Sequence, residues 1–198
     1  MGFKAQVVTE DSASGAQVID GSLKFDSSLN QYLTKTFGSA GNRKTNTASV
    51  WIKRSSISDA FQRIFNCDTA GNALHEITLN FDSGTDRDTL ISEYYIGSQS
   101  RVKTNAQLRD TGWYHIVVIY NSPAAEADRQ IIYINGERQS LSNSVSVGEN
   151  NDGMFSSANE HRIGRGRNYA SGTAFNGSMS QFYFIDGQAL GPEYFGFT

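Results

Sequence analysis

Short apolar runs separated by small polar residues make up most of this chain. The runs at residues 22–25, 48–53, 61–65, 75–81 and 89–96 each have about the length of a β-strand. Gly, Asn, Asp and Ser, which favour turns, fill the stretches between them. The pattern therefore predicts an all-β domain built from many short strands, each about five residues long.

One run, residues 113–120, is apolar or aromatic at both sets of alternating positions. It holds no Lys, Arg, Asp, Glu or Pro, the residues with which an edge strand is protected from further pairing. The run predicts a central strand that is covered on both faces. This favours two sheets packed face to face over one open sheet.

Asn135-Gly136 is a strong turn signal, because both residues readily take the positive φ angles of a tight hairpin. It predicts that a strand at residues 129–134 is followed by an antiparallel return at residues 137–141. The last strand is expected at residues 178–185, and a short helical turn at residues 190–195.

The composition fits one domain and excludes several classes of protein. A chain of 198 residues is long enough for one sizeable core and short for two. The net charge of -3 argues against nucleic-acid binding by bulk charge. No stretch approaches the ~20 apolar residues that span a membrane, and the lone Cys67 cannot form an intrachain disulfide. We expect an N-terminal arm at residues 1–21 and a single sandwich domain at residues 22–198.

Two groups of motifs resemble the laminin G-like domains, which belong to the concanavalin A-like jelly rolls. The first group is Trp113-Tyr114-His115 at the start of the central strand, followed by Tyr133-Ile134-Asn135-Gly136 at the hairpin. The second group closes the domain, with Phe175-Asn176-Gly177 and then residues 182–190. The resemblance implies a two-sheet antiparallel jelly-roll β-sandwich.

The sequences Gly41-Asn42-Arg43-Lys44 and residues 184–190 resemble those of laminin G-like proteins encoded by tailed bacteriophages. That resemblance implies a structural virion protein: a capsid decoration, fibre or tail-associated subunit. Its partners would be other virion proteins and further copies of itself, with no nucleic acid and no membrane. Residues 1–9 lack the apolar core of a signal peptide, so we expect synthesis in a host cytoplasm.

The same architecture also hosts glycoside hydrolases, so catalysis has to be weighed. A retaining enzyme of this kind needs two carboxylates about 5–5.5 Å apart. On one strand this requires closely spaced acidic residues, as in E-x-D-x-x-E or E-x-D-x-E. No such motif occurs in the chain. We therefore expect a protein that is not an enzyme and has no catalytic residues.

Calcium is the one cofactor that the sequence leaves open. Asp82, Asp86 and Asp88 cluster between two expected strands, and hard cations bind several oxygen atoms. Their spacing does not match an EF-hand loop, and the alternative is a solvated turn rich in Asp and Gly. Asp152, in a polar loop, is an equally weak candidate.

The residues expected to contact other subunits lie near both ends and in one basic loop. Apolar pairs in the arm suit strand addition at a sheet edge, guanidinium groups suit anionic partners, and aromatic residues are enriched at interfaces. The alternatives are a solvated loop for the arginines and packing of both ends on their own domain. The candidates are Val7, Val8, Arg165, Arg167, Tyr194, Phe195 and Phe197.

The alternative function is a carbohydrate-binding module that recognises a host surface glycan. Carbohydrate-binding members of this fold stack aromatic side chains on sugar rings. Tyr94, Tyr95, Phe155 and Tyr169 are the candidates for that role, unless they are buried in the core or in a subunit interface.

Overall fold

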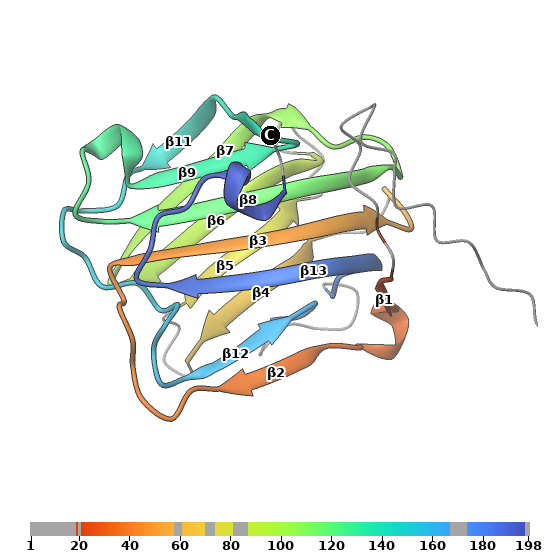
Figure 1. Ribbon diagram of the computed structural model, residues 1–198, viewed down its shortest axis with the longest axis horizontal. Helices are drawn as coiled ribbons and strands as arrows, with labels where there is room; N and C mark the ends of the chain where they lie inside the picture. Colours follow the sequence, from red (N-terminus) through yellow and green to blue (C-terminus); the bar gives the residue numbers. More distant parts are fainter. Residues whose placement is uncertain are drawn as a thin grey trace, which may run out of the picture.

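The computed structural model describes residues 19, 21–57, 61–69, 74–80, 87–166 and 174–196. These residues form two antiparallel sheets, of six and seven strands, that pack face to face (Figure 1). The prediction of an all-β, two-sheet jelly-roll sandwich is confirmed. The helical elements of the described residues are the three 3-10 turns Ser27–Leu29 (η1), Glu126–Asp128 (η2) and Pro192–Phe195 (η3). No helix among the described residues is long and apolar enough to cross a membrane.

The six-stranded sheet has the order β1-β13-β3-β8-β9-β10, and all its neighbours are antiparallel. Its strands are β1 (Leu23–Phe25), β13 (Gly177–Asp186), β3 (Thr45–Arg54), β8 (Trp113–Asn121), β9 (Gln130–Ile134) and β10 (Glu137–Arg138).

The seven-stranded sheet has the order β11-β7-β6-β5-β4-β12-β2. Its strands are β11 (Leu141–Val145), β7 (Ser98–Gln107), β6 (Thr89–Ile96), β5 (Leu74–Asn80), β4 (Gln62–Asp68), β12 (Glu160–Ile163) and β2 (Leu33–Thr36).

Strand β8 is the central strand that its two apolar faces predict. It lies between β3 and β9, with Val117 opposite Ser49 of one neighbour and Tyr133 of the other. Ile116 and Val118 point into the space between the sheets and belong to the main core cluster. Val117 and Ile119 lie on the other face and are also buried.

The C-terminal residues cover this outer face of the six-stranded sheet. The Thr47 hydroxyl donates to the carbonyl of Gln188 at 2.8 Å and accepts from the backbone N–H of Leu190 at 2.9 Å. Farther along, the ring of Phe195 lies 6.4 Å from the ring of His115 on β8. Figure 1 shows η3 in front of β8 and β3. The apolar residues on both faces of β8 are therefore explained by a core on one side and the chain's own end on the other.

The expected hairpin is present but its return strand is short. Asn135 and Gly136 have φ angles of 50° and 80°, as the turn requires. The return strand β10 spans only Glu137–Arg138, and the chain then crosses to the other sheet as β11. Strand β7 was not predicted, because its sequence SQSRVKTNAQ has almost no apolar residues.

Candidate functional site

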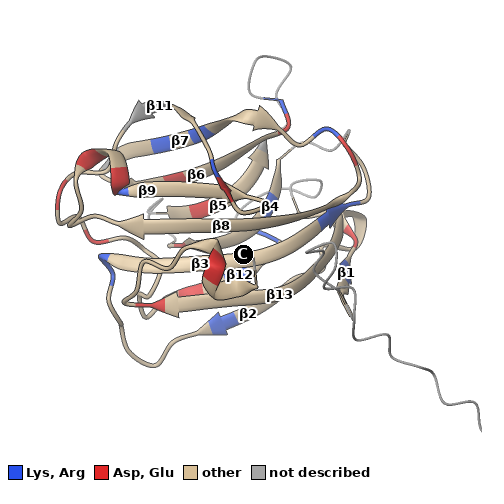
Figure 2. Ribbon diagram, turned by 45° about the horizontal axis from the view of Figure 1, so that its top comes forward, with Lys and Arg blue, Asp and Glu red and all other residues tan. Residues whose placement is uncertain are grey.

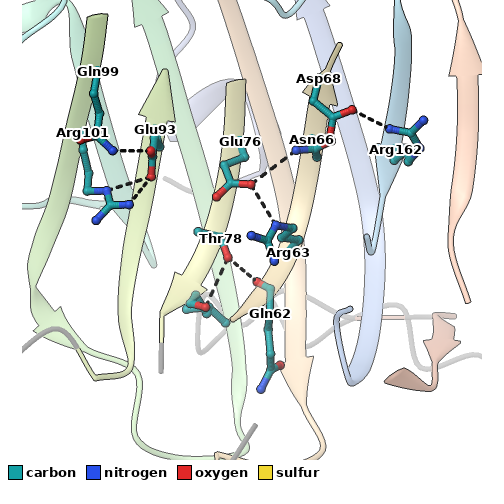
Figure 3. A network of polar contacts seen from close by, with 11 residues as sticks. Gln62, Arg63, Asn66, Asp68, Glu76, Thr78, Glu93, Gln99, Arg101 and Arg162 are labelled. Atoms are coloured by element: carbon teal, nitrogen blue, oxygen red, sulfur yellow. Dashed lines mark hydrogen bonds and ion pairs between the residues drawn. The ribbon is translucent and has the colours of Figure 1, made fainter. Parts of the chain in front are cut away.

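A row of polar side chains crosses the outer face of the seven-stranded sheet (Figure 3). The strand register places Arg162, Asn66, Glu76, Glu93 and Arg101 opposite one another on five consecutive strands. Figure 2 shows charged bands on β5, β6 and β7, whereas β8 is uncharged along its length. Such a row arises because alternate residues of a strand share a face.

Ion pairs and hydrogen bonds engage both central carboxylates of this row. Glu76 accepts from Nε of Arg63 at 2.9 Å and from the Asn66 amide at 3.4 Å. Glu93 accepts from Nε and Nη2 of Arg101 at 2.8 and 2.6 Å, and from Gln99 at 2.6 Å.

A third carboxylate on this face is paired in the same way. Asp68 accepts from Nη1 of Arg162 at 3.1 Å, and Nη2 of Arg162 lies 2.8 Å from Glu160. The side chains of Asp68 and Arg162 are both more than nine-tenths buried. The row therefore consists of three neighbouring groups, in each of which an arginine balances a carboxylate.

Glu76 and Glu93 form a carboxylate pair that the sequence analysis missed. The two residues are directly opposite on antiparallel strands, where Cβ atoms lie about 5 Å apart, so their carboxylates are neighbours on the same face of the sheet. Burial raises the pKa of Glu76, the Arg63 guanidinium opposes that rise, and the negative charge of Glu93 adds to it. The search for acidic spacing along one strand could not find the pair, because its members lie on different strands. The only sequence signal is one glutamate in each of two neighbouring apolar strands.

A second site lies at one end of the sandwich and has a different character. A cavity of about 410 Å³, here called the end pocket, opens between the β2–β3 loop, the residues that follow Gly153 and the end of β13. Its lining consists of Phe37, Gly38, Ser39, Ala40, Gly41, Ser156, Phe184 and Asp186.

The carboxylate of Asp186 is fixed in the end pocket by the β2–β3 loop. Its Oδ1 accepts from the backbone N–H of Asn42 at 2.9 Å. A Cβ at Gly41 would overlap this carboxylate, so only glycine leaves room for it there. The N–H of Gly41 in turn donates to the carbonyl of Ser156 at 2.7 Å, which ties the loop to the far wall of the pocket.

The remaining walls of the end pocket combine aromatic rings with an unusual serine. The rings of Phe37 and Phe184 are half-buried and lie 6.3 Å apart, and Phe37 also packs on His161 at 4.6 Å. Ser156 has a φ of 65° and is buried, and its hydroxyl has no hydrogen-bond partner among the described residues. The end pocket thus offers an apolar surface next to polar atoms with spare hydrogen-bonding capacity.

A third surface, here called the edge groove, lies between neighbouring edges of the two sheets, next to β1 and β2. Two adjoining cavities of about 330 and 140 Å³ share Leu33, Ile163 and Phe182 as lining residues. In the described part of the chain, β1 pairs with β13 only along Gly177–Met179, so the rest of that edge of β13 carries no strand. Figure 1 shows β2, β12 and β13 along the same side of the molecule.

Two of the four calcium candidates, Asp88 and Asp152, lie within the described residues, and each is paired with an arginine. Asp88 is buried and accepts from Nη1 of Arg54 at 2.9 Å, so its charge is already balanced. Asp152 is half-exposed and lies 3.6 Å from Nη1 of Arg43. Asp82 and Asp86 lie outside the described residues. Within the described ranges, no group of three or more His, Cys, Asp or Glu residues has the arrangement of a metal site.

The predicted contact residues have different environments. Tyr194 is 66% exposed, whereas Phe195 packs on its own domain, 5.9 Å from Tyr183. The guanidinium of Arg165 lies over the ring of Tyr32 at 5.3 Å. The other candidates, Val7, Val8, Arg167 and Phe197, lie outside the described residues. Among the aromatic residues considered for sugar stacking, Phe155 and Tyr94 are buried, Tyr95 is 36% exposed, and Tyr169 lies outside the described residues.

Three solved structures with this sandwich include two sugar complexes. The sialidase CBM40 of Ruminococcus gnavus, bound to α2,3-sialyllactose, is 15% identical with a TM-score of 0.54, over 83% of this chain and 96% of that one. Domain 4 of the arabinanase AbnA from Geobacillus stearothermophilus, in complex with arabinotriose, is 18% identical with a TM-score of 0.54, over 77% and 65%. The LG1-3 region of the laminin α2 chain is 13% identical with a TM-score of 0.61, over 88% of this chain and 33% of that one. At these identities the likeness concerns the fold.

The sequence itself matches a family model. A laminin G model described as "Concanavalin A-like lectin/glucanases superfamily" matches residues 26–193, which include all the described strands except β1. Among curated proteins, no sequence matches that of the chain. The chain therefore belongs to the concanavalin A-like lectin/glucanase superfamily, as a laminin G-like domain.

Proposed function

We propose that this domain is a non-enzymatic glycan-binding module. The observation that carries the proposal is the contrast between its two polar sites. On the sheet face, guanidinium groups hold the paired carboxylates Glu76 and Glu93 within a buried network. At the end of the sandwich, Asp186 has an oxygen, Oδ2, with no hydrogen bond among the described residues, next to half-buried aromatic rings. Binding without bond cleavage suits such an arrangement better than acid–base catalysis, which needs a free pair of carboxylates.

The similar structures support this proposal. Two of them are solved with arabinotriose and with α2,3-sialyllactose. A further similar structure is one of botulinum neurotoxin type C, whose cell entry depends on interaction with two ganglioside molecules. The fold is therefore one on which sugar binding has arisen in several settings, although function has to be argued from each site separately.

A glycan array combined with size-exclusion chromatography tests the proposal. We expect the monomer to bind a defined subset of glycans and to release no reducing sugar from β-glucans or other polysaccharides. A heat-treated sample is the control for both assays. Sugar release that disappears on changing Glu76 or Glu93 to Gln would instead identify a hydrolase, and an array without any binding would leave no glycan function.

The second candidate function is that of a structural subunit in a tailed-phage virion. The sequence motifs shared with phage-encoded laminin G-like proteins suggest this role, and the edge groove favours it. Leu33 and Leu23, on the edge strands of the two sheets, are about half-exposed, and in the described residues the edge of β13 beyond Met179 has no partner strand. An extended segment of another protein chain can add to such an edge through backbone hydrogen bonds.

The N-terminal arm of a second copy is the occupant that we propose for this groove. Gly21 and Ser22 line the groove, and the Ser180 hydroxyl donates to the carbonyl of Gly21. The preceding residues include the apolar pairs Val7-Val8 and Val18-Ile19. Since Gly21 lies in the groove, we propose that two copies that face each other there exchange the residues that precede it.

A truncation that starts at Gly21 separates the two candidates. Under the structural candidate, the full chain self-associates or joins purified particles, and the truncated chain folds but stays monomeric and unattached. Mass spectrometry of purified particles provides an independent check. A full-length chain that is monomeric and absent from particles would remove the structural candidate and leave the glycan-binding module.

A further inference from the structure

We infer that the end pocket is the site that binds the glycan, and that it takes a neutral sugar ring. This inference rests on the proposed function and adds to it the location of the site and the charge of the ligand. In this arrangement Asp186 accepts hydrogen bonds from sugar hydroxyls while the rings of Phe37 and Phe184 contact the apolar side of the sugar.

The end pocket has the size and composition of a small-molecule site. Its volume of about 410 Å³ lies within the roughly 300–1,000 Å³ of such sites. Two aromatic side chains supply apolar surface, and few polar groups converge on the same space. Ligand sites are usually built in this way, since apolar walls give affinity and a few polar atoms fix the orientation.

Asp186 is held in place and still has capacity to accept. The N–H of Asn42 occupies one side of Oδ1, and Oδ2 has no hydrogen-bond partner among the described residues. A carboxylate has about four lone-pair positions, so several remain for ligand hydroxyls. Hydrogen bonds to an ionised acceptor are roughly twice as strong as those between neutral groups. A pair of neighbouring hydroxyls is the ligand group that matches two carboxylate oxygens.

Ser156 provides a second, independent indication of a ligand. Its side chain is buried against the pocket, and its hydroxyl has no partner among the described residues. An unpaired buried hydroxyl destabilises a protein, and most buried polar groups therefore have partners. The Ser156 oxygen has almost no exposed surface in this structure, so its side chain has to turn toward the pocket before a sugar hydroxyl can supply the partner that it lacks.

The charge of the lining selects the class of sugar. Asp186 is the one charged residue among the described residues that line the pocket, and these include no Lys or Arg. A sialic acid or uronic acid carboxylate would face Asp186 without a cation to balance it, and like charges in contact disfavour binding. A neutral sugar carries only hydroxyls to this site. The end pocket therefore predicts a preference opposite to that of a sialic acid receptor.

The test compares Asp186→Asn with a matched control, Asp110→Asn. Asp110 is also an exposed aspartate whose Oδ1 accepts a loop N–H, that of Gly112 at 2.8 Å, but it does not line the end pocket. Affinity for neutral and for sialylated glycans is measured by array and by titration calorimetry, with EDTA present. We expect Asp186→Asn to weaken neutral-glycan binding by about tenfold or more, and Asp110→Asn to leave it unchanged. Phe37→Leu, which removes a ring and keeps an apolar side chain, should also weaken binding.

The outcomes distinguish this inference from the proposed function. If the unaltered protein binds no glycan, the proposed function itself fails. If it binds glycans but neither Asp186→Asn nor Phe37→Leu weakens binding, the end pocket is the wrong site. Binding restricted to sialylated glycans, or binding abolished by EDTA in the unaltered protein, would overturn the direct contact between Asp186 and a neutral sugar. If Asp186→Asn fails to fold, Phe37→Leu alone decides the assignment.

Discussion

The imidazole of His75 stacks on the ring of Phe155 in the core, with the ring centroids 3.9 Å apart. The histidine is fully buried, and neither of its ring nitrogens has a hydrogen-bond partner among the described residues. Tyr120 and Tyr94 surround it edge-on, at 4.9 and 5.8 Å. Burial lowers the pKa of His75 to about 3, with a smaller contribution from the charge of His161. The core therefore holds His75 in its neutral form.

This arrangement predicts that stability falls with pH below neutrality. The unfolded chain takes up a proton on His75 near pH 6.5, whereas the folded protein resists it until about pH 3. The free energy of unfolding is therefore unaffected by the titration of His75 above pH 6.5. Between pH 6.5 and about pH 3 it falls by about 1.4 kcal/mol for each pH unit. Urea denaturation at a series of pH values between 7 and 4 measures the slope.

His75→Leu is the control for this prediction. Leucine is apolar and cannot titrate, so its stability should depend less on pH than that of the unaltered protein. Burial also lowers the pKa of His115 and of His161, so some acid sensitivity will persist. Equal slopes for the two proteins would show that His75 does not couple folding to protonation.

The Arg63–Glu76 pair predicts a large non-additive effect on stability. Both side chains are only 5% exposed, and their charged atoms lie 2.9 Å apart. Glu76→Leu removes the carboxylate and leaves the Arg63 guanidinium buried without it, so we expect the free energy of unfolding to fall by about 3–5 kcal/mol. The double variant Arg63→Met, Glu76→Leu removes both charges and should lose less than the single variant.

An exposed pair of similar geometry is the control. Arg138 and Asp128 lie 2.7 Å apart, and both side chains are about half-exposed. Asp128→Ala should change the free energy of unfolding by less than about 1 kcal/mol, because water screens the pair. Similar losses for Asp128→Ala and Glu76→Leu would mean that the charged row on the sheet face adds nothing specific to stability.

Local sequence patterns predicted the strands that bury apolar residues. The apolar residues at 113–120 are enough to predict the central strand β8. Strand β6 was expected at residues 89–96, and it lies there. Strand β7 was missed because it has few apolar residues. Its place in the sheet comes from its backbone pairing with β6 and β11. On β8, the buried His115 is held by a residue far away in the sequence, since the hydroxyl of Ser49 on β3 lies 2.9 Å from its Nε2.

The candidate sites depended on contacts that no local pattern contains. Asp88 resembled a calcium ligand in sequence, but Arg54, far away along the chain, neutralises it. Glu76 and Glu93 became a pair only through strand register. The end pocket joins two loops, near positions 40 and 156, to the end of β13 at Asp186, and none of these segments by itself carries a binding motif. Distant segments must be placed before such sites are visible.

The central position of β8 predicts that Val117→Asp does not fold. Val117 is completely buried on the face covered by the C-terminal residues, so an aspartate there would be a buried carboxylate without a partner. Leu33→Asp is the control, because Leu33 is 47% exposed on the terminal strand β2. We expect the Leu33 variant to remain soluble and to melt cooperatively. Cooperative melting of the Val117 variant at a similar temperature would contradict the placement of β8.

Gly41→Ala tests whether the position of the Asp186 carboxylate matters for binding. A methyl group at residue 41 would overlap that carboxylate, so Asp186 has to rotate away and give up its hydrogen bond from Asn42. The loss of one exposed hydrogen bond costs roughly 1 kcal/mol, so the protein should still fold. Glycan affinity should fall nonetheless, because the acceptor oxygens have moved. Gly21→Ala is the control: Gly21 does not line the end pocket, and a Cβ there meets nothing within 4 Å. If calorimetry gives the two variants the same affinity as the unaltered protein, then the placement of Asp186 by the β2–β3 loop does not determine sugar binding, and the carboxylate acts, if at all, by charge alone.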